Sequence, residues 1–221
     1  MFVLGLALLL TSPAARAGDG WTCQDYADQP ALLQELEKPA GIGSLTREQQ
    51  DCLEKNLSRT KEQTVKGKIS RVLLVNAYAY DTFMWSGLVE RHLREIDQSD
   101  PDVAYLYSFY LYNRPLSPKY DDAIHWSEVA LERKDVWSGD TYVKRVSQLM
   151  KVRALAAAKI WQGATESGQK ELADDARVRT KTFAREWIEY RRSAGLDSTQ
   201  AELLCVSAAG AAACSVKEEP K

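Results

Sequence analysis

Apolar residues recur every three or four positions through most of this chain, and this period predicts helices. After Gly67 the apolar set is Ile69, Val72, Leu73, Ala77 and Tyr80, and before Asp97 it is Trp85, Leu88, Val89, Leu93 and Ile96. Each set covers one side of a helix. Nowhere do apolar and polar residues alternate strictly for the length of a strand. The pattern therefore predicts an all-α fold of stacked antiparallel helical hairpins.

Two further helices are predicted in the middle of the chain, because the pairs Asp100-Pro101 and Ser117-Pro118 both have the form of a helix start. In each pair, an acidic or hydroxyl residue supplies an N-cap acceptor and a proline supplies the fixed φ of the first helical position. The run Val103–Tyr112 between them is apolar on every side. We therefore expect the first of these helices to lie between neighbours.

A long helical hairpin is predicted next, followed by a short last helix. The first helix of this hairpin is rich in alanine, which permits close contact between helices. Gly195 suits the position directly after the end of the second helix. The expected boundaries are Ser138 or Asp140, Gly163 or Gly168, then Gln169 and Ser193, and for the last helix Asp197 and Cys205. The expected organisation is a signal peptide (1–17), an N-terminal hairpin (18–66), the central hairpins (67–195) and a short helix with a tail (196–221).

The N-terminal segment predicts export. Phe2–Leu10 is apolar but too short to cross a bilayer, and Ala15-Arg16-Ala17 has the small-x-small form of a signal-peptidase site. The mature protein is expected in the periplasm or outside the cell. After the leader, a helix is predicted over Trp21–Lys38, and Thr46-Arg47-Glu48-Gln49 has the form of a capping box at the start of the next helix.

Export makes disulfides the expected state of the four cysteines. Cys23, Cys52, Cys205 and Cys214 all follow the leader and allow three pairings. We favour Cys23 with Cys52 and Cys205 with Cys214, because each pair closes a local loop. A zinc site is less favoured, because no CxxC pair occurs and neither histidine is near a cysteine in sequence. We expect no metal and no cofactor.

The composition does not favour nucleic acid or a membrane as a partner. The chain has 29 Lys and Arg against 31 Asp and Glu, a net charge of −2 and a pI of about 5.8, so nothing favours nucleic acid. No segment after the leader is long and apolar enough to span a membrane. We therefore expect no stable membrane insertion of the mature chain.

The segment Ala123–Leu131 resembles the second helix of a tetratricopeptide (TPR) repeat, with Ala123 and Ala130 in the small positions. The preceding unit is similar, with Ala77, Tyr80 and Pro101 in family positions. Departures from the family pattern occur at Leu73, Val89, Ile96 and Ser127. The resemblance implies a short solenoid that binds a protein or peptide in its concave side. The turn at residues 138–141 also resembles exported TPR proteins of bacterial envelope machines, including gliding-motility complexes.

Aromatic and arginine side chains along the inner helices are the candidate partner-binding residues, because such side chains dominate interface energetics. The predicted set is Arg71, Tyr78, Tyr105, Phe109, Tyr112, Asn113, Tyr142 and Arg145. The alternative is that the next helix of the same chain covers these rings. The hypothesis is a non-enzymatic scaffold that binds other envelope proteins.

An enzyme is the competing hypothesis. His92 and His125 are the only histidines, and we expect the first to be structural and the second to lie on the surface. Glu166-Ser167 resembles the pair that carries the catalytic acid of lytic transglycosylases, which implies an exported peptidoglycan-active enzyme or a cell-wall binder. Cations of the late helix form a basic outer side, and interleaved Glu186 and Glu189 favour a solvated face over an anion site. These cations are Arg177, Arg179, Lys181, Arg185, Arg191 and Arg192.

Overall fold

The computed structural model describes residues 45–77, 82–114 and 116–214, and every regular element in these ranges is a helix. The predicted all-α fold is therefore confirmed. The chain divides into two compact units, Met1–Asp97 and Gln98–Lys221, and this boundary falls inside the predicted hairpin region 67–195. The predicted signal peptide, the helix over Trp21–Lys38, Cys23 and Tyr78 lie outside the described residues.

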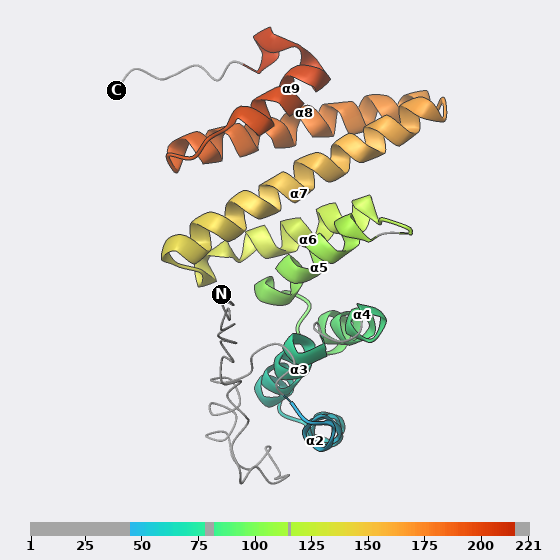
Figure 1. Cartoon of the computed structure of the whole chain (residues 1–221), viewed down its shortest axis with the longest axis vertical. Coiled ribbons are helices and arrows are strands. Elements are labelled where there is room, and N and C mark those ends of the chain that lie inside the picture. Colours follow the sequence, from blue (N-terminus) through green and yellow to red (C-terminus); the bar gives the residue numbers. More distant parts are fainter. Residues whose placement is uncertain (1–44, 78–81, 115, 215–221) are drawn as a thin grey trace, which may run out of the picture. The chain divides into compact units, whose positions relative to one another are not determined.

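The described residues of the first unit form three α-helices, and the third of them runs into a π-helical turn (Figure 1). They are α2 (Arg47–Arg59), α3 (Gln63–Ala77) and α4 (Thr82–Arg91), with the π-helix at His92–Ile96. The predicted capping box is present: the Gln49 backbone N–H donates to Thr46 Oγ1 over 3.3 Å, and the Thr46 N–H donates to Gln49 Oε1 over 2.8 Å. The core of this unit consists of Cys52, Leu53, Leu57, Val65, Ile69, Val72 and Leu73.

The start of α3 corrects the prediction that this helix follows Gly67. The helix begins at Gln63, and Gly67 lies inside it. The Glu62 carboxylate accepts hydrogen bonds from the backbone N–H groups of Thr64 (3.0 Å) and Val65 (2.7 Å), so it satisfies donors that a helix start leaves unpaired. Glycine is a weak helix former, but one glycine in a helix costs only about 1 kcal/mol relative to alanine.

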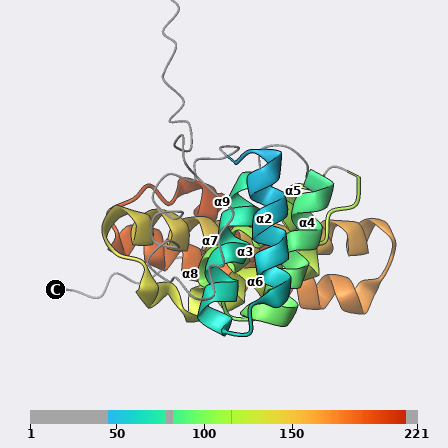
Figure 2. The same ribbon diagram turned by 90° about the horizontal axis from the view of Figure 1, so that it is seen from below.

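The second unit consists of hairpins that pack in chain order. Its helices are α5 (Pro101–Asn113), α6 (Tyr120–Glu132), α7 (Gly139–Glu166), α8 (Lys170–Ser193) and α9 (Thr199–Ala209), with 3₁₀ turns at Lys134–Val136 and Ala211–Ala213. Each helix packs on the next, and α5 also contacts α7. Figure 1 and Figure 2 both show α7 and α8 side by side. Adjacent antiparallel pairs are therefore the building units, as predicted.

Alanine lines the contacts between these helices. Ala123 and Ala130, the predicted small positions of α6, are fully buried. On α7, Ala154, Ala156 and Ala157 are also fully buried, and they face residues of α6, α8 and α9 in the core clusters. Side chains of one carbon allow the backbones of neighbouring helices to approach closely, which fixes the stacking of the hairpins.

One of the two predicted proline-containing helix starts is right and the other is wrong. At α5, Asp100 Oδ1 accepts from the N–H groups of Asp102 (3.0 Å) and Val103 (3.2 Å). The helix after Ser117-Pro118 instead begins at Tyr120, and both residues are exposed ahead of it. There the Lys119 backbone N–H donates to Leu111 O over 3.0 Å, so the residues after Ser117 return the chain to α5 before α6 starts.

The later boundaries follow the prediction closely except at the end of the last helix, because α9 (Thr199–Ala209) continues four residues past the expected Cys205. Helices α7 and α8 begin and end within one or two residues of the expected positions, and Gly195 takes a left-handed φ of 68° after the end of α8. The predicted Cys205–Cys214 disulfide is confirmed, with a Cα–Cα distance of 5.8 Å. Cys52 is also disulfide-bonded. Its predicted link to Cys23 stays a prediction.

Candidate functional site

Helix α5 has one buried side and one open side. The buried side carries Val103, Ala104, Tyr107, Ser108 and Leu111, which pack toward α6 and α7. The side that we call open carries Leu106 and Asn113, which are exposed, and Tyr105 and Phe109, which are partly buried; Leu106 is 36 % exposed. Helix α5 contacts both α6 and α7, so it lies between neighbours as expected, although part of its surface is exposed. Its apolar run serves the core on one side and presents aromatic and aliphatic side chains on the other.

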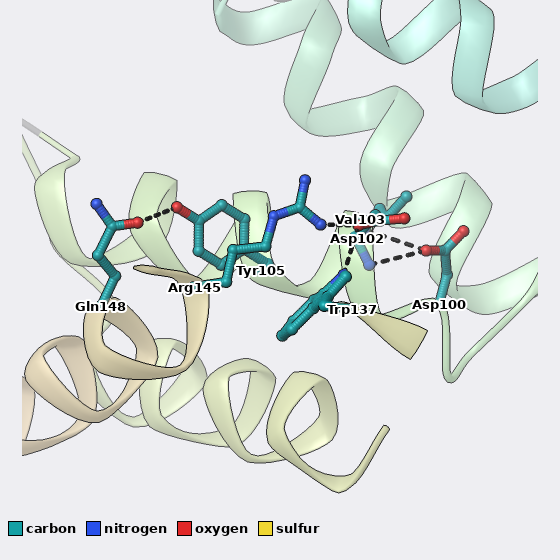
Figure 3. Close-up of polar contacts among 7 residues, drawn as sticks. All are labelled: Asp100, Asp102, Val103, Tyr105, Trp137, Arg145 and Gln148. Atoms are coloured by element: carbon teal, nitrogen blue, oxygen red, sulfur yellow. Dashed lines mark hydrogen bonds and ion pairs between the residues drawn. The ribbon is translucent and has the colours of Figure 1, made fainter. Parts of the chain in front are cut away.

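Arg145 of α7 lies against this open side. Its guanidinium carbon is 5.1 Å from the centre of the Tyr105 ring and 5.1 Å from that of the Trp137 ring. The two rings meet edge to face, with their centres 6.1 Å apart. We call this group, together with its hydrogen-bonding neighbours, the Tyr105–Arg145 cluster; it comprises Asp102, Tyr105, Trp137, Arg145 and Gln148 (Figure 3).

Polar contacts fix the geometry of the Tyr105–Arg145 cluster. Asp102 Oδ1 accepts a hydrogen bond from Trp137 Nε1 over 2.9 Å and pairs with the Arg145 guanidinium. The Tyr105 hydroxyl donates to Gln148 Oε1, as Figure 3 shows. The side chains of Arg145 and Asp102 are 30 % and 39 % exposed, so solvent or another molecule can reach them. An ion pair with this exposure contributes at most about 1 kcal/mol to stability.

The structure brings together only part of the predicted site. Tyr105 and Phe109 lie one turn apart with ring centres at 5.2 Å, next to Arg145. Tyr112 lies further along α5, 5.9 Å from the Tyr120 ring and against the core between α6 and α7. Tyr142 packs partly buried against the core around Val146 and Leu149.

Asn113 does not join the Tyr105–Arg145 cluster. Asn113 is exposed at the end of α5, where its Nδ2 donates to Phe109 O over 2.9 Å. Arg71 is exposed on α3 in the other unit, and Tyr78 lies outside the described residues. Sequence reasoning missed Asp102, Trp137 and Gln148. Helical spacing offered a signal for two of them, because Asp102 is three residues before Tyr105 and Gln148 is three after Arg145.

Tyrosine ionisation links this region to stability at high pH. Burial raises the pKa of Tyr112, and the neighbouring Tyr120 raises it further. Burial also raises the pKa of Tyr190, and the neighbouring Tyr142 adds to that increase. A raised folded-state pKa means that the unfolded chain loses these protons first. The contribution of the two tyrosines to stability is therefore fully present below their unfolded-state pKa of about 10, and it is lost as the pH rises through their folded-state pKa.

We therefore expect the free energy of unfolding to fall as the pH is raised from about 9 to about 11, and to fall less in Tyr112→Phe. Urea unfolding at several pH values measures this. Leu106→Phe serves as a control, because it also introduces a phenylalanine but changes no titrating group. Identical pH dependence in the wild type and Tyr112→Phe would contradict the assignment to Tyr112.

Glu166 is not placed as a catalytic acid should be. It is the last residue of α7, it is exposed, and its Oε1 accepts a hydrogen bond from Gln162 Nε2 over 2.9 Å. A carboxyl group that serves as an acid near neutral pH is normally desolvated, so that it keeps its proton. The solvent around Glu166 does not provide this environment.

The histidines lie where a structural role places them. His92 is fully buried, and its Nδ1 is 2.9 Å from Ser70 Oγ, which is 1 % exposed, so no substrate can reach this pair. His125 is exposed, with its ring beside Trp126. Among the described residues no three His, Cys, Asp or Glu side chains gather closely enough to bind a metal. In the same part of the chain, no helix combines the length and the apolar character needed to cross a bilayer.

Fold and site together define the class: an all-α protein of antiparallel helical hairpins, with an aromatic and arginine cluster at the junction of its α5 and α7 helices. No protein-family model, curated protein or solved structure matches the chain.

Proposed function

We propose that this protein is a non-enzymatic scaffold that binds a protein or peptide through the open side of α5 and the adjoining Tyr105–Arg145 cluster. The observation that carries the proposal is the composition of this surface. A solvent-facing helix side normally carries charged and polar residues, whereas α5 presents the exposed Leu106 beside the partly buried rings of Tyr105 and Phe109. Exposed apolar side chains that adjoin one another mark an interaction site more often than isolated ones do.

The chemistry of the surface suits protein recognition. Tyrosine and arginine are enriched among residues that contribute most to binding, because they bury much area with few rotatable bonds. Arg145 is already held in place by Asp102 and by two aromatic rings, so little side-chain freedom is lost on binding. A partner can bury the ring faces while it pairs with the accessible edge of the ion pair.

The arrangement of the helices supports a TPR-like binding mode. In the second unit, α5 contacts both its hairpin partner α6 and the following helix α7, and buried alanines lie at these contacts. The partner is then an extended or helical segment laid along α5 and α7. Disulfides favour an oxidising compartment, which supports export to the periplasm or beyond the cell. A place in a bacterial cell-envelope machine is the finer form of this proposal.

Site-specific photo-crosslinking in native envelopes tests the proposal. A photoreactive phenylalanine at Leu106 probes the open side of α5, and the same residue at Leu172 of α8 is a matched control, because the two leucines are 36 % and 43 % exposed. We expect a discrete crosslinked protein from position 106 and none from position 172. Identical products from both positions, or none from position 106, would count against the proposal.

The peptidoglycan-active alternative has its own test. Because Glu166 is exposed, we expect the purified mature protein to release no soluble muropeptides from peptidoglycan sacculi. Release would be measured by chromatography of the supernatant, with Glu166→Gln as the variant and Glu171→Gln, an exposed neighbour in α8, as the control. Release by the wild type and by Glu171→Gln, but not by Glu166→Gln, would replace the scaffold hypothesis with an enzyme.

A further inference from the structure

Helix α8 carries a row of three cations. Arg177, Lys181 and Arg185 are spaced by four residues, which places them about 6 Å apart along one side of the helix. Arg177 and Arg185 are exposed and Lys181 is partly buried. None of the three makes an ion pair with a residue that the structure describes. We call these three residues the α8 basic row.

The structure changes the charge balance expected from the sequence. Glu186, expected to dilute the basic side, instead pairs with Arg153 of α7. Arg179 forms an ion pair with Asp121 of α6 at 3.3 Å, and Arg192 forms one with Glu202 of α9 at 2.9 Å. The charges of α8 thus separate into residues that pair within the fold and a row that pairs with no described residue. Asp174 and Glu189 are exposed at the two ends of this row.

An apolar hollow lies beside the α8 basic row. It has a volume of about 230 Å³ and is lined by Arg177, Val178, Lys181, Ala208 and Ala209, so it lies where the end of α9 meets α8. Val178 in its wall is 60 % exposed. Ligand pockets for small molecules usually measure about 300 to 1,000 Å³. This smaller, open hollow fits a single apolar side chain of a peptide better than a free ligand.

We propose that the α8 basic row and this hollow bind an acidic peptide segment of another protein. The segment has carboxylates about one helical turn apart to face the three cations, and one leucine-like side chain to fill the hollow. Charge complementarity selects an acidic partner, and the apolar lining selects a peptide over a nucleic acid, whose backbone offers no such side chain. This surface is separate from the Tyr105–Arg145 cluster, so the proposal stands even if the function assigned to that cluster fails.

Fluorescence anisotropy with a designed probe tests this surface in the full mature chain. The probe is a labelled alanine-rich helical peptide with glutamate at every fourth position and one leucine on the same side. The test variant is Arg177→Glu/Lys181→Glu/Arg185→Glu. The control Lys55→Glu/Lys61→Glu/Lys134→Glu makes the same change in net charge at three exposed lysines elsewhere.

The proposal predicts three results: saturable binding by the wild type, binding at least about tenfold weaker in the α8 variant, and binding within about twofold of the wild type in the control. Replacing the leucine of the probe with serine is expected to weaken binding to the wild type further. The proposal is overturned if the probe does not bind, if both variants lose affinity equally, or if the leucine makes no difference. Binding that appears only after residues 215–221 are deleted also overturns it, because the surface then serves the chain's own end.

Discussion

Replacing Trp187 with alanine is expected to lower the free energy of unfolding of the second unit by about 3 to 5 kcal/mol. Trp187 of α8 is 1 % exposed and packs in a cluster with Ala154 of α7 and with Ala201 and Cys205 of α9. It therefore joins three consecutive helices. Truncation removes a large buried ring and leaves a cavity that small neighbouring side chains cannot fill.

Two control variants separate packing from other effects of this substitution. Trp161→Ala changes a partly buried tryptophan of α7 and is expected to cost clearly less. Trp187→Phe keeps an aromatic ring, and Trp187 Nε1 has no hydrogen-bond acceptor within the described structure, so no bond is lost; we expect a cost of about 1 to 2 kcal/mol. Urea unfolding followed by circular dichroism measures all three. Equal losses for Trp187→Ala and Trp161→Ala would contradict the assigned core.

Removing the Cys205–Cys214 disulfide is expected to lower the free energy of unfolding by about 2.5 to 3 kcal/mol. The bond spans a sequence separation of 9 and ties the end of α9 to the residue after the last 3₁₀ turn. In the loop-entropy account, the stabilisation comes from restricting the unfolded chain. Alanine is the suitable replacement, because both cysteines are buried and a serine hydroxyl there would lack a guaranteed partner.

The measurement compares oxidised wild type with Cys205→Ala/Cys214→Ala by urea unfolding. A second comparison under reducing conditions is its control. Reduction breaks the disulfide of Cys52 in both proteins but the Cys205–Cys214 disulfide in the wild type alone, so the difference in stability between the two proteins should disappear. Peptide mapping without reductant shows whether the bond is present. Equal stability of the oxidised wild type and the variant would contradict a stabilising disulfide at this position.

Helices were predictable from the sequence because apolar spacing and local caps act over a few residues. Asp100 caps α5 through contacts two and three residues away, so the sequence contains all that is needed. Ser117 has similar chemistry, but α6 begins only at Tyr120, after the Lys119 backbone N–H has donated to Leu111 O, and the local pattern does not show this contact. Helix existence was therefore easier to predict than the residue at which each helix begins.

The candidate site was less predictable, because its contacts join distant segments. Asp102 and Arg145 are 43 residues apart, and only the packing of α5 on α7 brings them together. The same packing places Tyr142 against the core, although the sequence suggested that it was available to a partner. Pairing between helices also redirects Glu186 toward Arg153 and leaves the α8 basic row unbalanced. Charges read along one helix cannot show such pairing.

The most direct test of partner binding uses the protein that crosslinks to position 106. Isothermal titration calorimetry measures its affinity for the wild type and for variants of the open side of α5. We predict that Phe109→Ala binds this partner at least about thirtyfold more weakly than the wild type. This loss corresponds to about 2 kcal/mol of binding free energy, which is typical of a dominant interface residue. The matched control Leu172→Ala should bind within about twofold of the wild type. Unchanged affinity in a Phe109→Ala protein that remains folded would contradict binding through the open side of α5.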